Sequence, residues 1–230
     1  MNKLIIEGHN IFKGCGFPYY VCGGFALELF AGKTLRAHSD LDISVFHENK
    51  RDVVSLLRSN GWSMYKRVME PGKIDGLTPI ADANDSKLDE IWVMWAIKPG
   101  SHLIPKPRDG ETDLFDYEIL RNAQTDINFI EIVLDSKEGS NFVYRKNKNI
   151  VRELDKAILH KDGIPYMSPE LVLFLKSPQS YFSHKFHKEK TPADFKTIML
   201  LLSHESKEWL MDALGTAYPD GFEWLNRVIK

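Results

Sequence analysis

The 230-residue sequence predicts an α+β fold with a helical C-terminal domain. Two observations predict this class. Strand-like and helix-like segments alternate in the first part of the chain, whereas mainly helix-like segments follow residue 150. A hydrophobic content of 43% is also enough for a sizeable core. We therefore expect one domain over residues 1–150 and a second over residues 151–230.

The first sixty residues alternate between helix and strand patterns. Leu41, Ile43 and Val45 alternate with polar residues, which is the period of a strand with one polar face. Glycines mark the ends of several segments. We expect a helix over 3–14, a strand over 19–22, a helix over 25–30 that ends at Gly32, a strand over 40–45, and a helix from 49 or 50 to near Gly61.

The remaining segments include two strands and several helices. Residues 62–118 are less regular, apart from a β-prone run at 91–97, and a second apolar strand is expected over 127–134. Ser168-Pro169-Glu170 is typical of a helix start, with an N-cap serine, proline at the first helical position and an acid in the first turn. Further helices are expected at about 191–203, 205–214 and 221–229.

Composition excludes several classes of protein. A net charge of −2 is unusual for a chain that coats nucleic acid, and no apolar run is long enough to cross a membrane. The first residues lack a secretory signal pattern, and Cys15 and Cys22 are too few for a disulfide scaffold. We therefore expect a cytoplasmic protein with two reduced thiols and no membrane partner; the oligomeric state stays open.

Two glycines and two aspartates form the first candidate site. Gly23-Gly24 precede a helix, so the backbone there is able to approach an anion closely, although many such pairs are simple turns. Asp40 and Asp42 lie on one face of the predicted strand, where two unpaired carboxylates repel each other. Mg²⁺ relieves this repulsion and also binds substrate phosphates. The alternative is a solvated polar face.

Glu131 is the third candidate acid. It lies within the apolar strand over 127–134, and burial of a lone carboxylate is costly unless it is paired or binds a metal. Beside Asp40 and Asp42 it would complete a site that holds two Mg²⁺ ions for displacement at phosphorus.

These motifs resemble those of a known superfamily. The chain contains GGFALEL at 23–29, then Gly32, Arg36, His38 and DLDI at 40–43. This series resembles the nucleotidyltransferase superfamily, and in particular the aminoglycoside 2″-adenylyltransferases and lincosamide nucleotidyltransferases. The resemblance implies the DNA polymerase β-like fold, a small mixed sheet with flanking helices. The resemblance continues at 129–135 and 165–176. Phe25 and Glu131 depart from it, because relatives more often have tryptophan and aspartate there.

The resemblance implies transfer of a nucleoside monophosphate, AMP from ATP, to a hydroxyl group with release of pyrophosphate. It implies that Asp40 and Asp42 hold Mg²⁺, that Gly23 and Gly24 border the triphosphate, and that Glu131 is a metal ligand, a general base or both. These roles agree with the chemistry of carboxylates and metal ions in phosphoryl transfer.

Other residues have two interpretations each. Arg36 could contact phosphate or pair with Glu28 or Asp40, and Ser39 could donate to phosphate or serve as a turn residue. Lys176 lies at the end of an apolar helix, and the resemblance favours a phosphate contact over a lysine that reaches to solvent. The basic run over 176–196 is either a solvated loop or a wall that faces phosphates.

The acceptor is the least determined part. A small molecule similar to an aminoglycoside or lincosamide is the first hypothesis, which would connect the protein with antibiotic resistance. The alternatives are transfer to protein or tRNA, as in toxin–antitoxin nucleotidyltransferases, and a binding module without catalysis. The acidic segments 82–90 and 109–118 either attract a cationic acceptor or keep loops soluble. Trp62, Trp92 and Trp95 either line an acceptor pocket or pack in the core, and core packing is expected for at least two of them.

Overall fold

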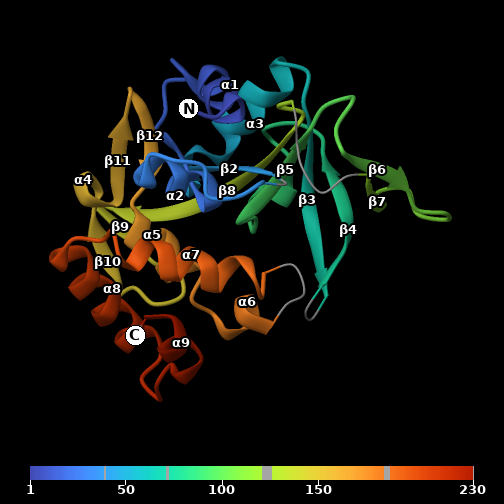
Figure 1. Cartoon of the computed structure of the whole chain (residues 1–230). Coiled ribbons are helices and arrows are strands. Elements are labelled where there is room, and N and C mark those ends of the chain that lie inside the picture. Colours follow the sequence, from blue (N-terminus) through green and yellow to red (C-terminus); the bar gives the residue numbers. More distant parts are fainter. Residues whose placement is uncertain (39, 71–72, 121–125, 184–186, 230) are drawn as a thin grey trace. The chain divides into compact units, whose positions relative to one another are not determined.

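The computed structural model describes residues 1–38, 40–70, 73–120, 126–183 and 187–229. It confirms the α+β class, with helices and a mixed sheet (Figure 1). The chain forms two compact units. The first comprises Met1–Val21 and Arg36–Asp135, and the second comprises Cys22–Leu35 and Ser136–Lys230.

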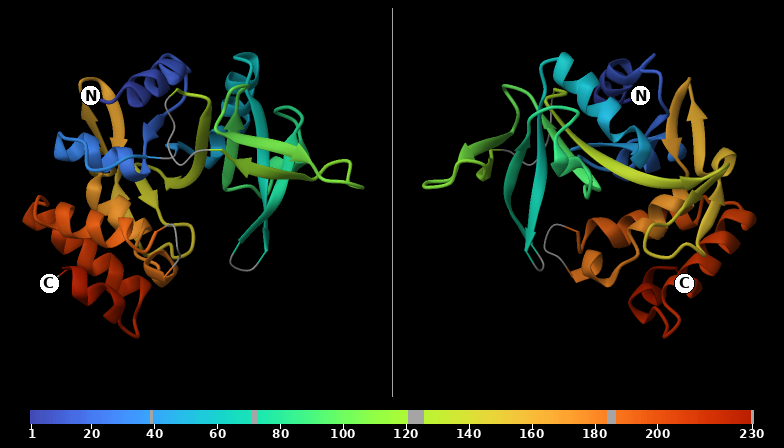
Figure 2. Two further views of the ribbon diagram at one scale, coloured as in Figure 1. Left: turned by 45° about the vertical axis from the view of Figure 1, so that its right-hand side comes forward. Right: turned by 180° about the vertical axis from the view of Figure 1, so that it is seen from behind.

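A mixed sheet forms the centre of the first unit. The order of its strands is β1-β2-β8-β5-β3-β4-β7-β6, and β2 and β8 are parallel whereas the other neighbours are antiparallel. The bounds are β1 (Tyr19–Val21), β2 (Leu41–Phe46), β3 (Ser63–Glu70), β4 (Lys73–Ile80), β5 (Val93–Ile97), β6 (Leu103–Pro107), β7 (Phe115–Ile119) and β8 (Phe129–Glu138). In both views of Figure 2, β3–β4 and β6–β7 are separate hairpins.

Helices α1 (Lys3–Phe12) and α3 (Lys50–Ser59) pack on this sheet. Gly8 of α1 approaches β2 so closely that an added Cβ would lie 2.3 Å from Leu41 Cδ2. Leu41, Ile43 and Val45 are fully buried on this face. Because side chains alternate along a strand, Asp42 lies on the opposite face. The short 3₁₀ helices η1 (His47–Asn49) and η2 (Ser86–Leu88) belong to the connections.

The second unit combines helices with short strands. Its helix α2 (Gly23–Ala31) packs on α5 (Pro169–Leu175) and α7 (Lys190–Met199), and α5 packs on α8 (His204–Ala217). The other helices are α4 (Leu154–Ala157), α6 (Gln179–Ser183) and α9 (Glu223–Ile229). The strands are the end of β8, β9 (Asn141–Val143) and β10 (Val151–Glu153), and the hairpin of β11 (Ile158–Lys161) and β12 (Ile164–Met167).

Most of the predicted elements are present, with small shifts of their ends. The irregular region 62–118 also forms β3, β4, β6 and β7, and residues 151–167 contain three short strands that precede the predicted helices. The two units also differ from the predicted division at residue 150, because α2 packs on helices from the C-terminal part of the chain.

Two expectations from composition agree with the described part of the chain. None of its helices combines the length and the hydropathy that a membrane span requires. Cys15 and Cys22 are both thiols, not halves of a disulfide.

Candidate active site

Asp42 and Glu131 lie side by side on the two parallel strands of the first unit. They are register partners, Asp42 on β2 and Glu131 on β8, and both are half-buried. Neighbouring strands are about 4.8 Å apart and register partners point to the same face, so the two carboxylates share one side of the sheet. The sequence places each acid on a strand, but the pairing of β2 with β8 brings them together.

Asp40 lies two residues before Asp42, immediately before β2, and is also half-buried. Asp40 therefore lies at the N-terminal end of β2, the same end of the strand that carries Asp42. Ser39, which the sequence predicts as a phosphate donor or turn residue, lies outside the residues that the structure describes.

Glu131 has two donors that sequence reasoning missed. The indole nitrogen of Trp95 donates to Glu131 Oε2 at 2.8 Å, and Arg67 Nη1 lies 3.4 Å from the same oxygen. Trp95 on β5 is the register partner of Glu131, whereas Arg67 comes from β3. Alternation along β5 could have indicated the face of Trp95, but no local signal identifies its partner strand.

The carboxylates can be compared with what a magnesium site requires. Within the described residues, no group of three or more His, Cys, Asp and Glu side chains is arranged to hold a metal ion. Mg²⁺, however, is usually bound by one or two carboxylates together with water and substrate phosphates. Asp42 with either neighbouring acid supplies such an open oxygen set, so these residues fit Mg²⁺ that arrives with a nucleotide.

Gly23 and Gly24 begin helix α2 in the second unit. Gly23 has a φ of +62°, a left-handed conformation that favours glycine, and Gly24 is buried. The side chain of the N-cap residue Cys22 does not cap the helix. The first-turn N–H groups are the donors that an anion at this end would use.

Arg36 lies close to His38 in the first unit. Its Nη1 donates to the carbonyl of Ala37 at 3.3 Å and lies 3.1 Å from His38 Nδ1. Its predicted role, a phosphate contact or a pair with Glu28 or Asp40, stays a prediction. Glu28 itself is buried, and its Oε1 accepts from the backbone N–H of Leu35 at 2.8 Å.

Lys176 follows α5 and its ammonium group has a carboxylate partner within the second unit. Lys176 Nζ donates to Asp194 Oδ2 at 2.5 Å, and the side chains are 15% and 4% exposed. The lysine therefore does not reach into open solvent. A phosphate contact would require Lys176 to share its ammonium between the phosphate and Asp194.

Ion pairs neutralise part of the two acidic segments. Asp89 pairs with Arg51 at 2.7 Å and Asp85 with Lys87 at 3.4 Å. In the β6–β7 hairpin, Arg108 pairs with Asp116 and Asp75, and Lys106 pairs with Glu118. Because these carboxylates already have cationic partners, the pairing favours a role in holding the loops and hairpin over attraction of a cationic acceptor.

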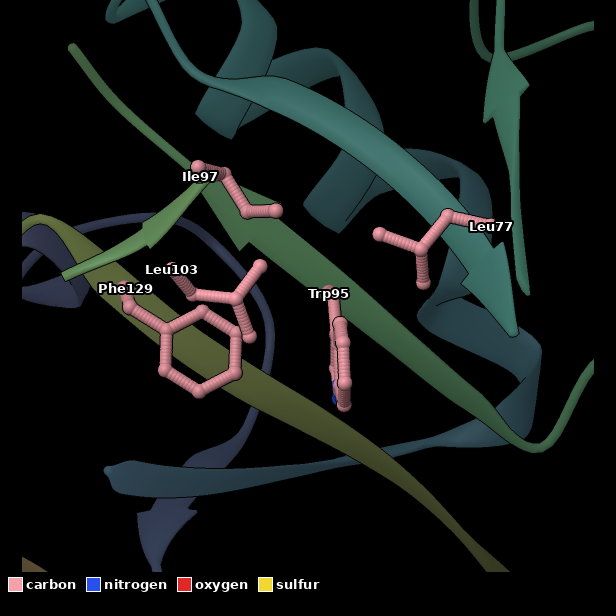
Figure 3. Packing of buried hydrophobic residues seen from close by; sticks show 5 residues of the cluster. All are labelled: Leu77, Trp95, Ile97, Leu103 and Phe129. Carbon is pink, nitrogen blue, oxygen red and sulfur yellow. The ribbon is translucent and has the colours of Figure 1, made fainter. Parts of the chain in front are cut away.

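The tryptophans support the prediction that at least two pack in the core. Trp62 and Trp95 are 3% and 5% exposed, whereas Trp92 stacks on His47 with ring centroids 4.4 Å apart. Trp95 belongs to a cluster with Leu77, Ile97, Leu103 and Phe129 (Figure 3). Since Trp95 is opposite Glu131 in register, this cluster continues from the acidic pair on the same face of the sheet.

Residues 5–75 match the family model described as aminoglycoside-2″-adenylyltransferase. The matched segment contains Gly23, Gly24, Arg36, Asp40 and Asp42, whereas Glu131 and Lys176 lie beyond it. Over these residues the match confirms the resemblance to this branch of the nucleotidyltransferases. No curated protein matches the chain in sequence.

Several solved structures are similar to this chain. The lincosamide antibiotic adenylyltransferase LnuA, bound to lincomycin, has 14% identity and a TM-score of 0.49, and the match covers 84% of this chain and 96% of LnuA. The antibiotic-resistance factor ANT(2″)-Ia in solution has 14% identity and a TM-score of 0.48, with 94% and 92% covered. Its crystal structure with adenylyl-2″-tobramycin has 11% identity and a TM-score of 0.48, with 92% and 97% covered.

Proposed function

We propose that this chain is a Mg²⁺-dependent nucleotidyltransferase, which moves AMP from ATP to a hydroxyl group of a small molecule similar to an aminoglycoside or lincosamide. The observation that carries the proposal is the register pairing of Asp42 with Glu131 on one face of the sheet, with Asp40 immediately before β2. The family match over residues 5–75 supports the same reaction class.

The carboxylates have separate roles in this proposal. Asp40 and Asp42 would hold Mg²⁺, with Glu131 as a further ligand, a general base or both; the ion supplies positive charge against the α-phosphate and the leaving pyrophosphate. The acceptor oxygen forms a bond to the α-phosphorus. At the same time the bond breaks between the α-phosphorus and the oxygen that links it to the β-phosphate, and that oxygen leaves as part of pyrophosphate. Glu131 would accept the hydroxyl proton of the acceptor.

Several residues are proposed to bind the phosphates of the nucleotide. We assign phosphate contacts to the backbone at Gly23 and Gly24, to Arg36 and to Lys176; the phosphate contact of Ser39, which lies outside the described residues, is proposed from the resemblance alone. Backbone N–H groups at a helix start, a guanidinium, a hydroxyl and an ammonium are all suitable donors to phosphate oxygens.

The test uses ATP with a label in either the α- or the γ-phosphate, with Mg²⁺ and a panel of aminoglycosides, lincosamides, tRNA and cell lysate. Transfer of the α-label to a small molecule, with release of pyrophosphate, is the expected result. Transfer of the γ-label would indicate a kinase instead. Label on tRNA or protein would replace the small-molecule acceptor, and no label with no pyrophosphate would favour a binding module.

The Asp42→Asn variant tests the role of the acidic pair directly. Loss of one carboxylate beside Glu131 should reduce Mg²⁺-dependent transfer by about a hundredfold or more, the size of effect that follows removal of a group that stabilises transition-state charge. Asp52→Asn is the matched control, because Asp52 is exposed in the first turn of α3 and should leave transfer unchanged. Equal MgATP affinity and activity in wild type and Asp42→Asn would refute the assignment.

A further inference from the structure

Both donors to Glu131 contact the same carboxylate oxygen. Trp95 Nε1 donates to Oε2 at 2.8 Å, and Arg67 Nη1 lies 3.4 Å from Oε2. Neither contact involves Oε1. A carboxylate that is held through one oxygen retains lone pairs on the other for a proton or a cation.

The packing of Trp95 fixes the position of its N–H group. The indole is 5% exposed, and its ring meets Phe129 edge-on at a centroid distance of 5.3 Å and Tyr117 edge-on at 5.4 Å. Figure 3 shows Trp95 on β5 and Phe129 on β8 within this cluster. Because the ring is enclosed by these neighbours, the donor at its edge has little freedom to follow a moving carboxylate.

Arg67 adds a positive charge to the same arrangement. Its side chain is 21% exposed, and its guanidinium carbon lies 5.8 Å from the centre of the Trp95 ring. The Nε atom of Arg67 is buried without a hydrogen-bond partner. The orientation of this guanidinium is therefore determined mainly by Glu131 and the face of Trp95.

The geometry points to Trp95 and Arg67 as positioning residues for Glu131. They hold Oε2 so that Oε1 is directed to the reaction, as a base for the acceptor hydroxyl or as a metal ligand. This inference rests on the proposed function. Its physical basis is the sensitivity of transfer reactions to the placement of reacting groups, where a displacement of about 1 Å costs up to about a hundredfold in rate.

Kinetics with matched variants test this role. Trp95→Phe removes the N–H donor and keeps an aromatic ring, so we expect kcat to fall about tenfold while the KM for ATP changes by less than about twofold. Trp62→Phe is the control, since Trp62 is 3% exposed and its Nε1 has no hydrogen-bond partner. Arg67→Met should lower kcat as well, and Arg67→Lys should restore most of it, because the contact with Glu131 uses a single nitrogen.

A second measurement does not depend on activity. The ¹⁵N–¹H resonance of the Trp95 indole, assigned in the wild type from nuclear Overhauser contacts with the Phe129 and Tyr117 rings, should move upfield in Glu131→Ala, while that of Trp62 stays in place. If the Trp95 resonance does not move, Glu131 is not its acceptor and the inference is overturned. This comparison also covers the case in which Trp95→Phe folds poorly.

The two proposals fail in different ways. A folded wild-type protein that transfers no nucleotide to any acceptor overturns the proposed function, and the positioning role with it. An active wild type in which Trp95→Phe and Arg67→Met behave like Trp62→Phe overturns the positioning role alone. A rise in the KM for ATP at unchanged kcat would likewise contradict it, because that pattern belongs to nucleotide binding.

Discussion

At the scale of single residues, Glu131 shows how a local anomaly becomes a site. A carboxylate within an apolar strand is unusual, and the sequence indicates that it needs a partner. The structure provides Trp95 and Arg67 as donors and Asp42 as a neighbour. Residue type and strand period were enough to select Asp42 and Glu131, whereas Arg67 lies in a segment without a regular pattern and could not be selected.

His47 gives a pH dependence at the same scale. Burial against Trp92, followed by the nearby charge of Lys50, lowers the pKa of His47 below its ordinary value of 6.5. Just below pH 6.5 the unfolded chain therefore binds more protons than the folded chain. The contribution of the half-buried, neutral His47 to the free energy of unfolding is complete above that pH and is lost as the pH falls.

The free energy of unfolding, measured by urea denaturation on both sides of pH 6.5, should therefore fall more steeply with acidification in the wild type than in His47→Gln. His9, whose pKa is also lowered by burial and Lys13, is present in both proteins and cancels in the comparison. Identical pH dependence in the two proteins would contradict the role of His47.

At the scale of elements, the edge strand β6 explains a feature that sequence patterns obscured. The backbone N–H of Arg108 donates to the carbonyl of Leu114, and the backbone N–H of Leu120 donates to the carbonyl of His102. The hydrogen-bonded positions of this hairpin therefore alternate with Pro105 and Pro107. The two prolines therefore occupy positions whose N–H groups would point away from β7. Prolines argue against a strand in a sequence, but they are compatible with an edge.

Replacement of these prolines should expose the edge. Pro105→Thr together with Pro107→Thr adds two outward N–H donors and strand-forming side chains, so we expect self-association at high protein concentration. Lys106→Thr is the control, because its N–H group points toward β7 and adds no outward donor. Sedimentation velocity would measure the difference, and a double variant that remains as monodisperse as Lys106→Thr would refute the blocking role.

At the scale of the whole molecule, the chain crosses between its two units more than once. Helix α2 follows β1 in sequence, yet it packs on α5 and α7, which begin 146 and 167 residues after the start of α2. Composition and the change to helical segments predicted a boundary at residue 150. They contain no information on which distant helices would bury Phe25, Leu27 and Leu29 of α2.

Native-state hydrogen exchange tests this assignment of α2. Leu171→Ala in α5 removes a fully buried side chain at a cost of about 2–5 kcal/mol, and should speed exchange of α2 amides together with those of α5. Leu77→Ala, in the cluster of the first unit, should speed exchange in β3 and β4 more than in α2. If α2 responded to Leu77→Ala and not to Leu171→Ala, it would belong with the first unit.

The sequence was sufficient for most helices, for the strands β1, β2, β5 and β8, and for the candidate acids, because these depend on short-range periodicity, capping residues and side-chain chemistry. Tertiary structure was needed for the hairpins of residues 62–118, for the pairing of Asp42 with Glu131, for the two donors on Oε2 and for the place of α2. Strand partners and register depend on packing between residues far apart in the chain, and local patterns do not encode those contacts.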